Sequence, residues 1–287
     1  AYAFNDGLFV PQGWEDAYKN FNKPASALWL KEPGKLRYFE YLKESKTVYV
    51  RHIAVVERGD ETINGFFEKV FRFIDSNEVD KFVLDIRLNG GGNNYLNKPV
   101  ITKIIGSKKI NRYGHLFIIT GAATFSAAQN LTNELEKYTE AIFVGEPTAE
   151  NVNFWGDIKT EVLPLSKLNV NLSWLWWQNM DPRDKRCWTA PNLAAEMSFD
   201  NYKAGYDSAT NIILNFKEEK RIEETIKGLV INGKMEEAIS VTKKYLEDPL
   251  HRYCKSELEE KINDIAYSFL MNNKLDEASR VFYMNVQ

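Results

Sequence analysis

Between residues 38 and 148, short segments rich in β-branched and aromatic residues alternate with amphipathic, helix-like segments. Runs such as FVLDI and LFIIT are short and mostly apolar, which is typical of strands covered on both faces. This alternation predicts an α/β fold with a mostly parallel sheet and flanking helices. Strands are predicted at 38–42, 47–56, 81–87, 115–121 and 141–148, and helices at 63–77, 98–105 and 126–139.

The rest of the chain divides into regions of different character. Residues 1–27 mix aromatic and polar residues without a helical or strand period, so they are predicted to form an irregular arm. Residues 155–198 alternate and then become loop-like, which predicts a hairpin followed by a long loop. The main domain is therefore expected at 28–215 and a small all-α module at 217–287.

The tail has apolar residues at i, i+3 and i+4, which predicts four short helices. Segments 230–239 and 271–279 are self-similar at a spacing of about 40 residues, which loosely resembles tetratricopeptide (TPR) repeats. The tail is expected either to pack as helical hairpins on the main domain or to bind a protein partner or a second copy.

Charge and hydropathy exclude some classes of partner. The 37 basic and 40 acidic residues are spread along the chain without a basic stripe, so nucleic acid is not an expected partner. No run approaches the roughly 20 apolar residues of a membrane span, and the first residues lack the pattern of a signal peptide. Cys187 and Cys254 have no zinc-like spacing, so free thiols are expected, with a disulfide between them as the less favoured alternative.

Two turns carry groups suited to catalysis. Glycines 90–92 directly follow a predicted strand, and their main-chain N–H groups are unobstructed by side chains. Ser126 follows the next predicted strand and begins a helix, where the N–H of Ala127 has no intrahelical acceptor. The two turns together are expected to supply a nucleophile and an oxyanion hole. The alternatives are that Ser126 or Thr124 only caps the helix and that the glycines only form a turn.

These turns belong to three ordered motifs that resemble those of the S41 serine peptidases, the C-terminal processing proteases and their relatives. The segment from Asp85 through Arg87 and Asn89 to the glycines matches Asp-Leu-Arg-x-Asn-x-Gly-Gly. Ser126 lies where the family has its nucleophile, and GEPT at 145–148 matches the Gly-Glu-Pro-Thr turn. The chain looks closest to the branch with Phe-Ser-Ala-Ala-Gln-Asn.

The resemblance covers roughly residues 28–215. It implies a fold similar to crotonase and Clp protease and a serine-type peptidase activity on a peptide or protein substrate. It further implies an oxyanion hole from the N–H of Ala127 and of Gly91 or Gly92, without a metal or an organic cofactor. It slightly favours an extracytoplasmic location.

The sequence departs from the family at the proton acceptor. Asn151 stands where the processing proteases have a lysine base, and Gln129 stands where a glutamate is typical. An amide cannot take the proton of a serine, so this is an atypical branch that lacks the catalytic lysine. No PDZ-like domain is evident before residue 84.

Other residues are candidates for the base or for a group that orients it. These candidates are His52, Glu150, Asn151 and Gln129, with Glu146 and Asp157 as further carboxylates near the turn. His52 lies in an otherwise apolar strand, so a hydrogen-bonded buried histidine is the alternative. His115 is expected at the opposite end of its strand from Ser126, and His251 on the surface of the tail.

Aromatic and basic residues near the hairpin suggest ligand contacts. Phe154 and Trp155 with Trp174, Trp176 and Trp177 are expected either to line an apolar pocket or to pack in the core. Arg183 and Arg186 either bind a substrate carboxylate or lie in a solvated loop.

The sequence thus predicts a serine hydrolase, a peptidase of the S41 type. The alternative is a catalytically silent binding protein for an apolar or peptide ligand, similar to the retinoid-binding relatives of S41, which also lack the lysine.

Overall fold

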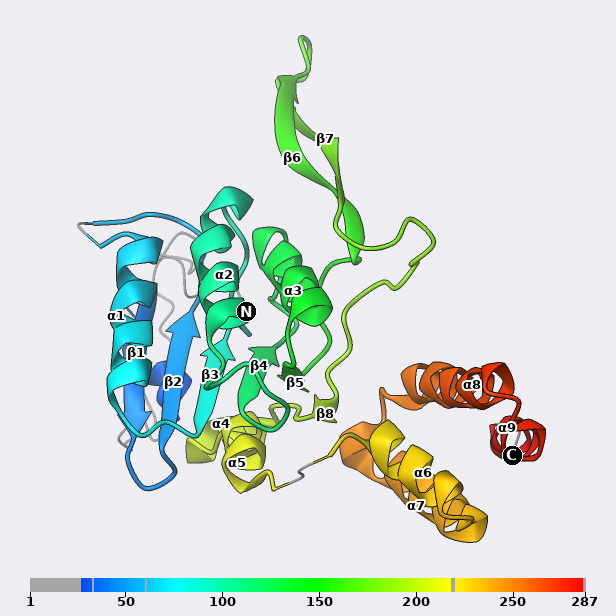
Figure 1. Ribbon diagram of the computed structural model, residues 1–287. Helices are drawn as coiled ribbons and strands as arrows, with labels where there is room; N and C mark the ends of the chain where they lie inside the picture. Colours follow the sequence, from blue (N-terminus) through cyan, green and yellow to red (C-terminus); the bar gives the residue numbers. More distant parts are fainter. Residues whose placement is uncertain (1–26, 33, 60, 218–219, 286–287) are drawn as a thin grey trace.

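The computed structural model describes residues 27–32, 34–59, 61–217 and 220–285, so the predicted arm, apart from Ala27, lies outside the described residues. Its centre is a six-stranded sheet whose strand order follows the chain (Figure 1). The first two strands are antiparallel and every later pair is parallel. The predicted α/β fold is confirmed. The strands are β1 (Arg37–Leu42), β2 (Thr47–His52), β3 (Lys81–Asp85), β4 (Leu116–Thr120), β5 (Ile142–Gly145) and β8 (Leu193–Ala194).

Helices cover both faces of this sheet, because alternate side chains of each strand point to opposite faces. On one face, Val48 and Val50 of β2 join a buried cluster with three helices. On the other face, Tyr49 joins a second cluster with a 3-10 helix and a helix late in the chain. The first three helices are α1 (Ile63–Ser76), α2 (Lys98–Gly106) and α3 (Ala127–Tyr138); opposite them lie η2 (Leu28–Leu30) and α5 (Ser208–Asn215), the latter preceded by α4 (Phe199–Ala204). A further 3-10 helix, η3 (Asn94–Asn97), leads into α2.

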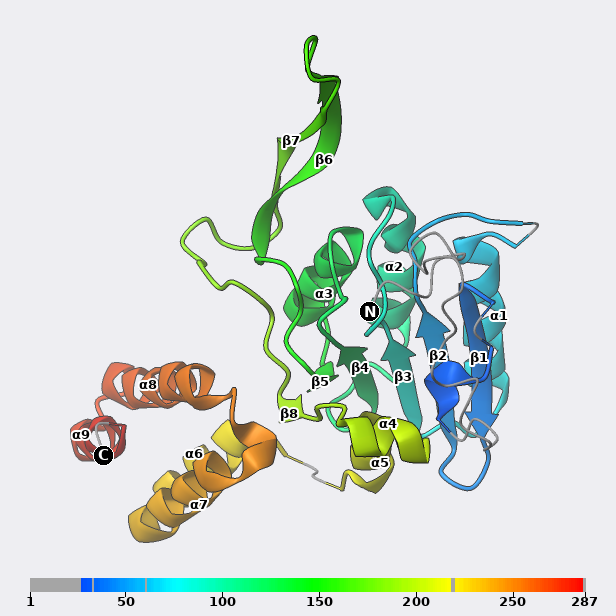
Figure 2. The same cartoon turned by 180° about the vertical axis from the view of Figure 1, so that it is seen from behind.

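The predicted hairpin forms a separate two-stranded sheet of β6 (Asn153–Val162) and β7 (Asn169–Gln178). It projects away from the central sheet (Figures 1 and 2). Its base is fastened to α3: Asn133 Nδ2 donates to the Val152 carbonyl at 2.7 Å, and Asn179 Nδ2 donates to Glu134 Oε1 at 2.9 Å. A long loop then leads to β8, as predicted.

The tail is helical, as predicted, and its helices bury their apolar sides in a cluster of their own. The two self-similar segments form the same turn, with Gly233 and Asn273 at φ 72° and 56°. Among the described residues no helix is long and apolar enough to cross a membrane. The elements are α6 (Ile222–Ile231), α7 (Met235–Glu247), η4 (Pro249–His251), α8 (Lys255–Met271) and α9 (Leu275–Met284).

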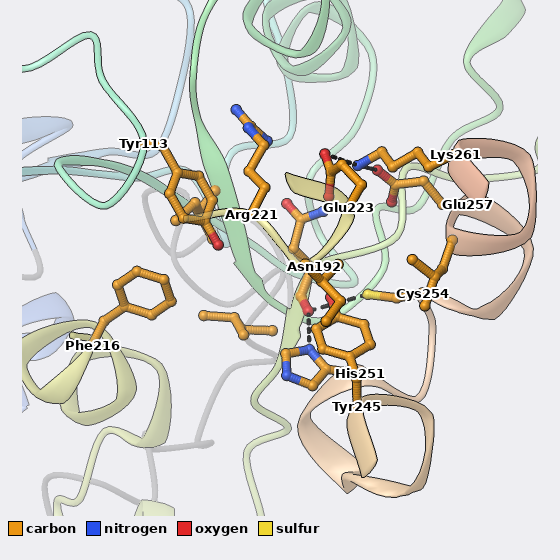
Figure 3. Close-up of a pocket in the computed structure, with 14 residues that line it drawn as sticks. Tyr113, Asn192, Phe216, Arg221, Glu223, Tyr245, His251, Cys254, Glu257 and Lys261 are labelled. Atoms are coloured by element: carbon orange, nitrogen blue, oxygen red, sulfur yellow. Dashed lines mark hydrogen bonds and ion pairs between the residues drawn. The ribbon is translucent and has the colours of Figure 1, made fainter. Parts of the chain in front are cut away.

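The tail contacts the edge of the sheet beside β8, and here the prediction for His251 is wrong. His251 is buried, stacks on Tyr245 with ring centroids 3.7 Å apart, and has Nδ1 3.3 Å from the Asn192 carbonyl oxygen (Figure 3). The buried thiol of Cys254 donates to the same oxygen at 3.2 Å. Cys254 and the exposed Cys187 are both free thiols. The tail sequence alone gave no sign of Asn192, because it lies about 60 residues upstream in the main domain.

Candidate active site

Three loops meet beyond the carboxyl ends of β3, β4 and β5. Because these strands are parallel neighbours, the loops that follow them lie at the same edge of the sheet. The Phe125 N–H donates to the Asn89 carbonyl at 3.0 Å, which joins the glycine loop to the serine loop. The Ala149 N–H donates to the Thr124 carbonyl at 2.9 Å, which adds the loop after β5. The three motifs of the sequence are therefore side by side.

Ser126 occupies a strained turn between β4 and α3. Its φ of 56° and ψ of −122° are unusual for a residue with a side chain, and such strain costs about 1–3 kcal/mol. The side chain makes no capping hydrogen bond to α3. Thr124 Oγ1 is occupied elsewhere, since it donates to the Ile86 carbonyl at 2.9 Å. The capping alternative is thus wrong, and a sharp strand-to-helix turn that presents a hydroxyl is the geometry of a nucleophile elbow.

Gly91 packs directly against this turn. A Cβ at this position would lie 2.7 Å from Ser126 Cβ and 2.9 Å from the Ala127 nitrogen, and φ is +101°. At Gly92, with φ +137°, a Cβ would lie 2.3 Å from the Val55 carbonyl oxygen. Only glycine allows the two chain segments to approach this closely. These glycines therefore have a role beyond forming a turn.

The main-chain donors near Ser126 differ in whether they are occupied. The Gly91 N–H donates to Asn89 Oδ1 at 3.0 Å, so it is already bonded. In the part of the chain that the structure describes, no acceptor is bonded to the N–H of Ala127 or of Gly92. Of the two glycines expected to serve the oxyanion hole, Gly92 is thus the one with an unoccupied donor.

Glu150 lies beside Ser126. Burial raises the pKa of Glu150 to about 7, and the nearby main-chain N–H of Ser126 lowers it only in part. A carboxyl group with a pKa near neutrality is suited to accept a proton.

The other candidates for the base have different environments. His52 is fully buried in a T-shaped contact with Phe67, and burial lowers its pKa to about 3. Neither ring nitrogen has a hydrogen-bond partner among the described residues, so His52 does not hold the Ser126 hydroxyl. Gln129 is buried and donates to Asn133 and Thr189, which holds a loop against α3. The Asn151 side chain is exposed.

The remaining histidine and carboxylates are bonded elsewhere. His115 Nδ1 lies 2.6 Å from the Asp80 carbonyl oxygen at the start of β4, far from Ser126 along the strand, as expected. Glu146 accepts from the Met197 N–H at 3.2 Å, and Asp157 accepts from Trp177 Nε1 at 2.9 Å.

The aromatic cluster forms neither a core nor an enclosed pocket. Trp155, Trp174 and Trp176 lie on the hairpin with 60%, 63% and 44% of their surface exposed. Phe154 at the hairpin base is buried, and Trp177 is half-buried with its ring edge near Tyr95. Both predictions for the three exposed tryptophans are therefore wrong, because the hairpin extends from the body.

The two arginines of the following loop already have carboxylate partners within the protein. Arg183 bonds Asp181, and Arg186 bonds Asp184 and Glu136. The solvated-loop interpretation is the one the structure supports.

Sequence reasoning missed the partners of the Asp-x-Arg motif. Asp85 accepts from the Tyr49 hydroxyl at 2.6 Å and from Arg87 Nε at 3.0 Å. Arg87 donates two bonds to Asp207 before α5, at 3.0 and 2.9 Å. Burial lowers the pKa of Arg87, but the charges of Asp85 and Asp207 outweigh it and raise the pKa above its ordinary value. The motif thus binds the end of β3 to α5, and an isolated Asp207 gave no sequence signal.

A pocket lies between the sheet edge and the tail, lined in part by Phe216, Arg221 and Lys261 (Figure 3). Ser126 is not among its lining residues. Burial raises the pKa of the Cys254 thiol in this pocket to about 11, so the thiol is unreactive near neutrality. Among residues 27–285, where the structure describes them, no group of His, Cys, Asp or Glu side chains is arranged to hold a metal ion.

Comparison with known proteins found similarity only among solved structures. No protein-family model matches the chain, and no curated protein matches it. Similar structures include a putative S41 protease from Bacteroides fragilis, with 20% identity over 62% of this chain and 54% of that chain, at a TM-score of 0.43. A putative peptidase from Parabacteroides merdae has 14% identity over 64% of this chain and 66% of that chain, at a TM-score of 0.46. The photosystem II D1 C-terminal processing protease has 16% identity over 56% of this chain and 48% of that chain, at a TM-score of 0.40.

S41 proteases are thus among the solved structures to which this α/β fold is similar. The matched region spans about half to two thirds of the length of these proteins.

Proposed function

We propose that this protein is a serine hydrolase, a peptidase of the S41 type, with Ser126 as its nucleophile. The observation that supports it most directly is the contact between the two turns. Ser126 is held at a strained φ of 56° without capping its helix, and Gly91 packs against it where no other residue fits. Strain retained at a serine whose side chain does not cap its helix is typical of an active site. The order of the three motifs supports a peptide or protein substrate.

In the proposed reaction, Ser126 Oγ attacks the carbonyl carbon of a peptide bond, and the carbonyl oxygen becomes an oxyanion. The N–H groups of Ala127 and Gly92 stabilise this charge, which is usually the largest catalytic contribution. The C–N bond then breaks, leaving an ester on Ser126, and water hydrolyses the ester.

Glu150 is the proposed proton acceptor in place of the family lysine. Its carboxylate takes the proton of the Ser126 hydroxyl and passes it to the leaving amine nitrogen. Support comes from its position near the main-chain N–H of Ser126 and from its pKa of about 7, which leaves both protonation states available at neutral pH. Asn151, at the position of the lysine, has no group that can do this.

The silent binding protein remains the alternative. It relied on Asn151 in place of the lysine and on tryptophans that would line a pocket. Asn151 is still consistent with it, but three of the tryptophans are exposed on the hairpin.

Labelling with a fluorophosphonate tests the proposal. We expect one covalent adduct, located on Ser126 by peptide mass spectrometry, and no adduct in Ser126→Ala. Ser256→Ala, which changes an exposed serine of α8, is the matched control and should label as the native protein does. Absence of labelling in a correctly folded protein, or an adduct at another residue, would contradict the proposal.

A further inference from the structure

The β6–β7 hairpin exposes an unusual amount of apolar surface. Between Trp155 and Trp176, nine large apolar side chains are exposed, and Leu165 at the tip is 96% exposed. Each leaves on the order of 100 Å² in solvent, roughly 900 Å² together, whereas the largest apolar patch of a typical monomer is about 300–600 Å². A two-stranded ribbon is also only marginally stable by itself in water. The hairpin therefore has the properties of a surface that another polypeptide covers.

The apolar side chains lie on both faces of the ribbon. Trp155 is the cross-strand partner of Trp176, with ring centroids 5.3 Å apart, and Trp174 shares their face of β7. Ile158 and Val162 belong to the opposite face of β6. A single ligand on one face would leave the other uncovered, whereas a second ribbon that extends the sheet adds neighbours on both.

The charges of the hairpin favour a second copy as the occupant. β7 has no charged residue, so it offers nothing to a strongly charged partner. On β6, Lys159 and Glu161 flank Thr160 and form an exposed ion pair at 2.8 Å. An antiparallel copy of β6 related by a two-fold axis at Thr160 sets each Lys159 opposite the partner's Glu161 and each Ile158 opposite the partner's Val162. The strand is thus self-complementary, as a two-fold interface requires.

We propose that two copies of this chain associate through their hairpins, with the β6 strands pairing antiparallel about Thr160. Pairing adds main-chain hydrogen bonds along the free edge of β6 and sets Ile158 and Val162 of the two copies against each other. This interface is independent of the tail, and it is also independent of the hydrolase activity.

Analytical ultracentrifugation of the full chain tests the proposal with variants that reverse or exchange the charges at Lys159 and Glu161. The native protein should be dimeric at concentrations of about 100 µM. Lys159→Glu sets like charges against each other twice and should weaken the dimer at least about tenfold. Lys159→Glu with Glu161→Lys restores the opposite charges and should restore the dimer. Lys167→Glu, which makes the same change of charge in the tip turn, is the matched control and should not weaken it.

Outcomes of three kinds would overturn the proposal. The first is a monomeric native protein. If this monomer dimerises only after residues 1–26 are removed, the surface of the hairpin is covered by that segment and not by a second copy. The second is a dimer that Ile158→Ser with Val162→Ser, which removes the apolar pair of the proposed interface, leaves unchanged. The third is a dimer that is lost on removing residues 217–287 but not in the hairpin variants, which would assign association to the tail. Circular dichroism of each variant establishes that it is folded.

Discussion

At the scale of single residues, the candidate site depends on a few atoms that approach closely. A side chain at Gly91 would clash with the turn that holds Ser126. Ser126 itself has a positive φ, a backbone conformation that glycine adopts more readily than other residues. Such features are costly for stability and are retained where the geometry has a use.

Replacing Gly91 tests this contact. Gly91→Ala adds a methyl group against Ser126 Cβ and two main-chain atoms at a φ of +101°, so we expect a loss of about 2–4 kcal/mol in the free energy of unfolding. Fluorophosphonate labelling of Ser126 should also be lost. Gly90→Ala is the control, because a Cβ there meets nothing within 4 Å. Urea unfolding measures the stability of both variants. Equal losses of stability in Gly91→Ala and Gly90→Ala would show that the contact is unimportant.

The pKa of Glu150 predicts how labelling depends on pH. The carboxylate form is the base, so the labelling rate of the native protein should rise with pH around a midpoint of about 7. Glu150→Gln should lower the rate by about 10²–10⁴-fold and remove this midpoint. Glu236→Gln, at an exposed position of α7, is the control. An unchanged midpoint in Glu150→Gln would exclude Glu150 as the base.

The same group affects stability with a definite sign. Burial disfavours the charged carboxylate, so the native protein should lose stability relative to Glu150→Gln as the pH rises from about 4.5 to about 7. Thermal unfolding of both proteins across this range measures the difference.

At the scale of elements, hydrogen bonds from polar side chains connect segments that the apolar core does not connect. The first turns of α3 bury amides that fasten the hairpin base and the loop before β8, through Gln129 and Asn133. Arg87 similarly joins β3 to the segment before α5. These bonds hold the site loops in place without contributing a reacting group.

Asp207 tests the largest of these connections. Asp207→Asn leaves Arg87 buried with only Asp85 as a charged partner, so we expect a loss of about 3–5 kcal/mol in the free energy of unfolding. Asp200→Asn, an exposed position in the first turn of α4, should change it by less than about 0.5 kcal/mol. Urea unfolding compares the two, and similar values would mean that the ion pair does not stabilise the fold.

At the scale of the whole molecule, the tail and the central sheet have separate hydrophobic clusters. They meet where His251 and Cys254 face the Asn192 carbonyl and where Arg221 and Arg252 pair with Glu140 and Glu196. The candidate site lies beyond the carboxyl ends of β3 and β4, among the residues of the main domain.

Removing residues 217–287 should therefore leave the sheet folded and Ser126 reactive, with a lower unfolding temperature because Asn192 and its neighbours become exposed. Far-UV circular dichroism, thermal unfolding and fluorophosphonate labelling measure the three properties. Loss of labelling in a folded truncated protein would show that the tail takes part in the site.

The sequence by itself determined the order and type of most elements of this protein, although β8, α4 and α5 were not predicted. Apolar runs bounded by turns define β3 and β4 locally, and the 3.6-residue period defines α1 and the tail helices, because these signals come from neighbours in the chain. The three motifs also identified which loops would meet, since parallel neighbouring strands bring their carboxyl ends to one edge.

Only the tertiary structure decided which groups are paired, buried or exposed. The burial of His251, the partner of Arg87 and the exposure of the tryptophans depend on how distant segments are arranged in space. The pKa of Glu150 is of the same kind, because it results from burial and from one main-chain N–H. Such properties arise from distances between atoms that are far apart in sequence, and no local pattern records those distances.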